Sequence, residues 1–155
     1  MANAYLYKKK KMLLNVSHDF SEKKEIINNL VEKPFTLEER QKLNGTSITK
    51  LPVTAASIEL YNLMTLNEGK TFCSIEMRPK GTIFSFNVKS EVYSLVVPYY
   101  KLKIYKGRAE EYSFYQDNNF IKVWAGAGDA DVHSFVKKMR RFKSDTDFTR
   151  IEDLL

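Results

Sequence analysis

The chain has 155 residues, 43% hydrophobic and 28% charged, with a net charge of +6. This length predicts a single domain that buries a core without a metal or a disulfide, and the composition excludes general disorder. Cys73 is the only cysteine, so an internal disulfide is excluded and a reducing compartment is favoured. No apolar run approaches the ~20 residues of a membrane span and no secretory leader is evident, so the predicted location is the cytoplasm.

The N-terminal part of the chain predicts a basic arm followed by helices. Residues 1–16, which carry four consecutive lysines at Lys8–Lys11, are predicted to form either a strand that pairs with a sheet edge or a disordered arm. Residues 17–45 predict a helical hairpin. The pair Asp19 and Glu22 matches a capping box, in which the two side chains satisfy amide groups of the first helical turn. Thr36 and Glu39 repeat this spacing at the start of a second helix.

Residues 53–126 predict six or seven short antiparallel strands. Polar and apolar side chains alternate in several short runs, which is typical of strands with one buried face. Pro79 and Gly81 occupy turn positions and favour a hairpin, and Asp117-Asn118 favours a second tight turn. The segment 57–66 fits either a strand or a short helix.

The C-terminal part predicts one amphipathic helix over residues 129–143. Its apolar side chains follow a period of about 3.6 residues and form one face: Val132, Phe135, Val136, Met139 and Phe142. Its other face is basic. Residues 144–155 have a net negative charge and are predicted to form an acidic tail.

Short antiparallel strands from Thr71 to Ala125, closed by the helical stretch Val132–Met139, resemble a pleckstrin-homology-like barrel of the GRAM type. The resemblance lies in the order of elements and covers about half of the chain. It implies that the helix fills one open corner of a barrel. It also implies binding of lipids, peptides or proteins, although a fold does not determine a function.

The predicted fold class is therefore α+β, in one domain over residues 1–155. It consists of the helical hairpin, a strongly bent antiparallel sheet or small barrel, and the capping helix. Trp124 falls on the face opposite Ile121 and Val123, so it is either half exposed or part of a second packed layer. An exposed tryptophan at this position would indicate binding.

The segment 99–108 contains the main binding candidates. As a strand it would turn Tyr100, Leu102 and Ile104 inward and present an outward stripe of rings and bases. The candidates are Tyr99, Lys101, Lys103, Tyr105 and Arg108. Such a stripe suits single-stranded nucleic acid, and its lysines suit anionic lipid headgroups. A solvated strand face with cross-strand tyrosine pairs is the alternative interpretation.

The basic face of the last helix contributes Lys137, Lys138 and Arg141 as further candidates. Cations near a helix C-terminus are also favoured by the helix dipole, so this charge needs no ligand. The run Lys8–Lys11 has the same two interpretations, a contact with anionic lipid or a solvated arm.

Catalytic chemistry has little support in the sequence. The two histidines, His18 and His133, do not form a metal-ligand spacing with each other or with Cys73. Cys73 lies on an alternating strand beside Ile75 and Met77, which predicts a buried small hydrophobe rather than a nucleophile. No metal and no cofactor are expected.

The first functional hypothesis is a non-enzymatic binding or adaptor domain. It would contact a protein or peptide, with an anionic membrane as a further surface. The alternatives are single-stranded nucleic-acid binding through the tyrosine–lysine stripe and an enzyme of a type that the sequence does not identify.

Overall fold

The computed structural model describes residues 13–18, 20–107 and 110–154, with the backbone alone for 147–154. The described chain is α+β, with four helices and eight strands in one antiparallel sheet. The helices are α2 (Phe20–Val31), α3 (Leu37–Lys42), α4 (Ile58–Met64) and α5 (Ala130–Leu154). The strands are β1 (Leu13–Asn15), β2 (Ser47–Ala56), β3 (Phe72–Arg78), β4 (Gly81–Val88), β5 (Glu91–Pro98), β6 (Leu102–Lys106), β7 (Glu111–Gln116) and β8 (Asn119–Trp124).

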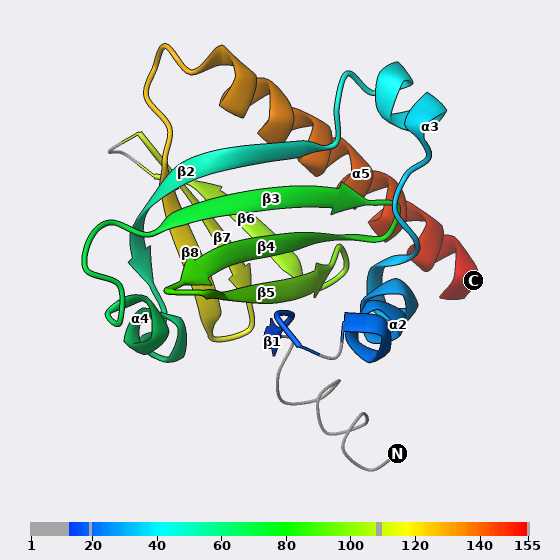
Figure 1. Cartoon of the computed structure of the whole chain (residues 1–155). Helices are drawn as coiled ribbons and strands as arrows, with labels where there is room; N and C mark the ends of the chain where they lie inside the picture. The colour runs from blue at the N-terminus through cyan, green and yellow to red at the C-terminus, as the bar shows by residue number, and fades with distance from the viewer. Residues whose placement is uncertain (1–12, 19, 108–109, 155) are drawn as a thin grey trace.

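The sheet is strongly bent and open. Its strand order is β1-β5-β4-β3-β2-β8-β7-β6, so β1 and β6 are its edges within the described residues. Figure 1 shows β2–β5 in front and β6–β8 behind them, with α5 passing along the upper side. Of the two alternatives, bent sheet or small barrel, the bent sheet is found. Six or seven strands were predicted; the three-residue β1 lies in the segment assigned to the arm.

β2 joins the two halves of the sheet by changing partner along its length. Its first half pairs with β3 as far as Pro52, and its second half pairs with β8 from Val53 onward. The register shifts between Ile48 and Leu51, and Lys50 has a φ of 60°. The predicted β region began only at residue 53, because this bulge and the proline interrupt the alternation of a regular strand.

The core lies between the two halves of the sheet and α5. The predicted apolar face of α5 is confirmed, since Val132, Phe135, Val136 and Met139 are buried and Phe142 packs against them. A smaller cluster on the outer side of the sheet joins α2 to β4, β5 and β1. Its buried members are Leu14, Ile27, Val31, Ile83 and Val96.

The two N-terminal helices are present, but they do not form a face-to-face hairpin. α2 packs on β4 and β5, whereas α3 has no buried residue. Figure 1 shows them well apart. The predicted capping box of Thr36 and Glu39 is confirmed by reciprocal hydrogen bonds of 3.2 and 3.0 Å. Asp19 lies outside the described residues.

The remaining helices differ from expectation in extent. The ambiguous segment 57–66 forms the helix α4. α5 begins where it was predicted but continues to Leu154, so the segment assigned to an acidic tail is helical up to that residue. The hairpins at Pro79–Lys80 and at Asp117-Asn118 are both confirmed.

Gly81 is the point where α2 meets the sheet. A Cβ atom there would stand 2.3 Å from Val31 Cγ1 and 2.5 Å from the carbonyl oxygen of Val97. We expect Gly81→Ala to lower the free energy of unfolding by about 2 kcal/mol, because the backbone oxygen cannot move aside. The measurement is the urea midpoint.

Gly69→Ala is the matched control, since no atom lies within 4 Å of the Cβ position of Gly69. Its stability should change by less than about 0.5 kcal/mol. Equal stability of the two variants would contradict the close approach of α2 to β4.

Candidate functional site

A turn before β6 reverses the predicted orientations of Tyr99 and Tyr100. β6 begins at Leu102, and the Lys101 amide donates to the Pro98 carbonyl at 3.0 Å. Tyr99 is fully buried, and its hydroxyl donates to the Arg78 carbonyl at 3.0 Å. Tyr100 is 47% exposed. The prediction that Tyr99 faces outward and Tyr100 inward is therefore wrong, because the turn breaks the alternation. Burial raises the pKa of the Tyr99 hydroxyl.

The other candidates of this segment lie on β6 or beside it. Lys103 and Tyr105 are exposed, as predicted. Lys101 is half-buried, with its ammonium 6.0 Å from the centre of the Tyr100 ring. Arg108 lies outside the described residues. The predicted stripe is thus reduced to Lys103 and Tyr105 on the outer face of β6.

On α5, Lys137 and Arg141 are exposed, whereas the side chain of Lys138 is half-buried and hydrogen-bonded. The Lys138 ammonium donates to the carbonyl oxygens of Gly45 at 2.9 Å and Asn44 at 3.4 Å. Partial burial lowers the pKa of this ammonium. Lys138 therefore ties α5 to the loop that precedes β2.

β6 and α5 adjoin at Ile104. This residue lines a small hollow of about 280 Å³ together with Arg140, Lys143 and Ser144 of α5. Lys103 and Tyr105 alternate with Ile104 along β6, so they lie on the opposite face of the strand, away from this hollow. The run Lys8–Lys11 lies outside the described residues.

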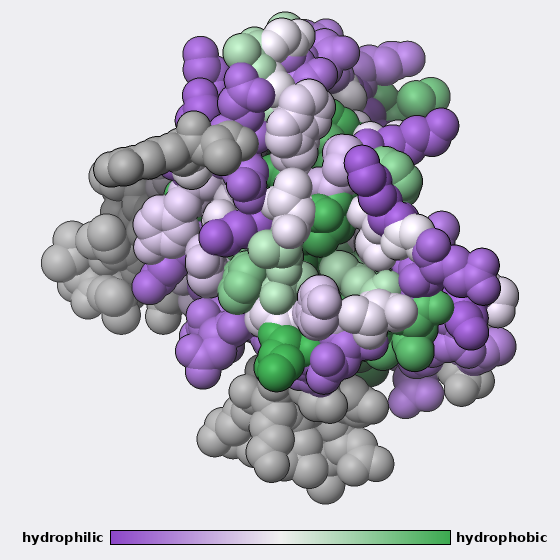
Figure 2. Space-filling view, turned by 90° about the vertical axis from the view of Figure 1, so that its left-hand side faces the viewer, coloured by the Kyte–Doolittle hydropathy of each residue, from purple (hydrophilic) through white to green (hydrophobic). Residues whose placement is uncertain are grey.

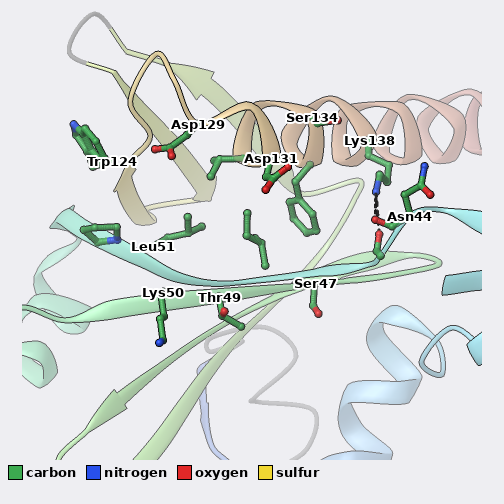
Figure 3. A pocket seen from close by; sticks show the side chains of 15 residues that line it. Asn44, Ser47, Thr49, Lys50, Leu51, Trp124, Asp129, Asp131, Ser134 and Lys138 are labelled. Carbon is green, nitrogen blue, oxygen red and sulfur yellow. Dashed lines mark hydrogen bonds between the residues drawn. The ribbon is translucent and has the colours of Figure 1, made fainter. Parts of the chain in front are cut away.

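A groove of about 1000 Å³ lies between β2 and α5. We call it the β2–α5 groove. Its floor is apolar and is formed by Ile48 and Leu51 from β2 and by Val132 and Phe135 from α5. Figure 3 shows Trp124 at one end and Lys138 at the other. The sequence predicted each of these residues as a candidate, but their position on one groove could not be predicted from it.

The groove exists because no described strand pairs with the first half of β2 on this side. The Val53 amide donates to the Thr71 carbonyl at 3.0 Å, so Val53 points its amide at the β3 side. Alternation then turns the nitrogen of Pro52 toward the β8 side, where proline has no hydrogen to donate. The β8 ladder stops at Val123, opposite Val53, and Trp124 is the last residue of β8.

The indole of Trp124 packs directly on the backbone of Gly126. The ring carbons Cη2 and Cζ2 lie 2.8 and 2.9 Å from the point where a Cβ of Gly126 would stand, so only glycine allows the indole to lie there. The Gly126 amide donates to Asp129 Oδ2 at 3.0 Å. The indole remains 45% exposed at the mouth of the groove.

His133 forms a hydrogen bond with the carbonyl group of Gly126. Its Nε2 lies 2.9 Å from the Gly126 carbonyl, which only accepts, so Nε2 carries the hydrogen. Its Nδ1 lies 2.6 Å from the Tyr112 hydroxyl, which donates to it when the imidazole is neutral. The sequence did not predict this role of His133, because Tyr112 is distant from it along the chain.

The charges of the groove are unevenly arranged. Figure 3 shows Asp129 beside Trp124 and Asp131 farther along the groove, between Asp129 and Lys138, whereas the side chains of Thr49 and Lys50 point away from α5. Asp131 is exposed and forms no hydrogen bond or ion pair with any described residue. Both carboxylates lie at the N-terminal end of α5, where the helix dipole stabilises them. The Trp124 end of the groove is therefore acidic on a chain whose net charge is +6.

A second apolar surface surrounds α4. Figure 2 looks at the side that carries α4 and shows apolar residues near its centre between charged margins. The exposed members include Ile58, Tyr61 and Phe72. The hollow beside α4, lined by Tyr61 and Met64 among others, measures only about 240 Å³. The β2–α5 groove is much the larger of the two.

The described residues offer little to catalysis. Cys73 is fully buried, and burial raises the pKa of its thiol from 9.0 to about 12, so it remains protonated at neutral pH. No three potential metal ligands come together in the described part of the chain. What the groove offers is an apolar floor, a fixed indole and two carboxylates, which suit recognition of a ligand.

Comparison of the chain with protein-family models, with curated proteins and with solved structures finds no match. Among the described helices, none combines the length and apolar character that crossing a membrane requires.

The packing of Trp124 on Gly126 can be tested by fluorescence, because this is the only tryptophan of the chain. We expect Gly126→Ala to push the indole outward, since the new methyl group would stand 2.8 Å from a ring carbon. The acrylamide quenching constant of tryptophan fluorescence should rise, while the free energy of unfolding changes by less than about 1 kcal/mol.

Gly128→Ala is the control, because no atom lies within 4 Å of the Cβ position of Gly128. Its quenching should equal that of the unmodified protein. An unchanged quenching constant in Gly126→Ala would show that the indole does not lie on this glycine.

The raised pKa of Cys73 predicts a loss of stability at alkaline pH. Above pH 9 the unfolded chain loses the thiol proton while the folded protein keeps it, so the free energy of unfolding falls as pH rises. We expect a loss of about 1 kcal/mol between pH 9 and 10, and a smaller one in Cys73→Ala. Urea titrations at both pH values measure this. Equal losses in the two proteins would contradict the burial of the thiol.

Proposed function

We propose that this protein is a non-enzymatic binding domain that holds an extended segment of a protein partner in the β2–α5 groove. The observation that carries the proposal is Trp124, a sole tryptophan kept 45% exposed at the mouth of a groove of about 1000 Å³. Exposed tryptophans in grooves are frequent centres of binding energy. A groove of this size, open along its length, suits a peptide better than a small metabolite.

Side chains, more than the backbone of β2, would supply the affinity. An unpaired strand edge accepts an added strand, but proline and bulges are the devices that prevent such pairing. Pro52 and the bulge between Ile48 and Leu51 lie on this edge. The partner would therefore place apolar side chains on Leu51 and Phe135.

Charge complementarity favours a basic residue of the partner at the Trp124 end. Ring carbons of Trp124 and Asp129 Oδ2 lie within 4 Å of the same point above Gly126. A lysine or arginine side chain that packs on the exposed part of the indole would lie close to this carboxylate. Asp131 adds a second carboxylate without an ion-pair partner among the described residues.

The resemblance to a pleckstrin-homology-like barrel belongs to this proposal. Two features support it: a single strand, β2, shared by both halves of the sheet, and one C-terminal helix whose apolar face completes the core. Binding of proteins or peptides is among the functions that this resemblance implies. The cytoplasm is the compartment in which the proposed partner would be met.

Selection of peptides from a random display library against the full chain tests the proposed function. We expect selected peptides to change the fluorescence of Trp124 on binding and to carry a basic residue beside apolar ones. Trp124→Ala should weaken their binding at least tenfold, which corresponds to about 1.4 kcal/mol. Dissociation constants measured by calorimetry report this effect.

Tyr61→Ala is the control, because Tyr61 is an exposed ring on α4 that does not line the groove. Binding should be unchanged in this variant. A library that yields no binder, or binders equally sensitive to Tyr61→Ala and Trp124→Ala, would refute the groove as the binding site.

A further inference from the structure

The outer face of β6, β7 and β8 carries a row of three aromatic rings, one from each strand. We call Tyr105, Tyr115 and Phe120 the ring row. The centre of the Tyr115 ring lies 5.6 Å from that of Tyr105 and 5.1 Å from that of Phe120. Tyr105 is 55% exposed, and the other two are half-buried. The sequence predicted only Tyr105, because the row forms across strands.

Lysines border the ring row on both sides. Lys103 lies directly opposite Tyr115 in the sheet, and the ammonium of Lys122 lies 5.8 Å from the centre of the Phe120 ring. Lys106 lies opposite the buried Tyr112, on the same face of β6 as Ile104, and so does not belong to this surface. Neither Lys103 nor Lys122 forms an ion pair with a described residue. Their charge is available to an anionic partner.

Cross-strand packing accounts for part of this arrangement but not for all of it. Neighbouring rings on a sheet stabilise each other, and edge lysines discourage aggregation. The planes of Tyr105 and Tyr115 cross at 81°, so the two rings meet edge to face, and Tyr105 nevertheless remains 55% exposed. An exposed ring beside lysines without ion-pair partners is the arrangement that single-stranded nucleic acids use, with bases on rings and phosphates on cations.

We propose that the outer face of β6–β8 binds single-stranded nucleic acid, with a base stacked on Tyr105 and phosphates on Lys103 and Lys122. A lipid headgroup would use the lysines but gains little from a row of rings that crosses the sheet. The proposal is independent of the peptide proposal, because none of these residues lines the β2–α5 groove.

Fluorescence anisotropy of labelled oligo(dT) and oligo(U) of 12 nucleotides, with the full chain, tests the proposal. Two phosphate contacts predict that the dissociation constant rises about sevenfold between 50 and 200 mM salt. Tyr105→Ala should raise it by about fivefold or more, and Tyr105→Phe should leave it nearly unchanged. Lys103→Gln should reduce the slope of log affinity against log salt by about 0.7.

Tyr61→Ala and Lys24→Gln are matched controls, since both residues are exposed and lie on α4 and α2. Their affinities should equal that of the unmodified protein, and urea midpoints confirm that each variant is folded. The same variants are tested for co-sedimentation with vesicles of 70% phosphatidylcholine and 30% phosphatidylserine.

Three results would overturn the proposal. The first is absence of oligonucleotide binding at 50 mM salt, with or without binding to the vesicles; vesicle binding alone would assign the surface to anionic lipid. The second is binding that weakens in Lys103→Gln but not in Tyr105→Ala, which indicates adhesion by charge alone. The third is equal weakening in Tyr105→Ala and Tyr61→Ala.

Discussion

The change of partner within β2 is the constraint on which the rest of the structure depends. One strand holds β3 with its first half and β8 with its second, so both halves of the sheet share a single continuous backbone. Pro52 stands at the exchange and ends the pairing toward β8 because it has no amide hydrogen. The bend that follows creates the interior that α5 fills and leaves the β2–α5 groove open beside it.

α5 contributes to the core and to the groove with different parts of one surface. Val136 and Met139 are buried in the core, whereas Val132 and Phe135 also form the groove floor. At its N-terminal end, His133 and Asp129 hold Gly126 by hydrogen bonds, and Gly126 in turn carries Trp124. The most exposed recognition group of the groove thus rests on a rigid backbone position, which reduces the entropy lost on binding.

The two proposed surfaces differ in the physical interaction that would provide affinity. The groove combines an apolar floor with an acidic end and suits a partner segment that is apolar and basic. The ring row combines exposed rings with lysines and suits an anionic, stacking partner. Both include residues of β8, since Trp124 lies in the groove while Phe120 and Lys122 border the row. A single strand therefore connects them.

Three features could be predicted because each depends on neighbouring residues in the chain: the capping box at Thr36, the two hairpin turns, and the apolar face of α5. It also indicated that Trp124 opposes the buried Ile121 and Val123. Three other features follow from tertiary contacts alone: β2 begins at Ser47, a turn buries Tyr99, and backbone carbonyls accept hydrogen bonds from Lys138. The groove and the ring row also belong to this second group. Each depends on residues distant along the chain, whose proximity follows from strand pairing and packing rather than from any local pattern.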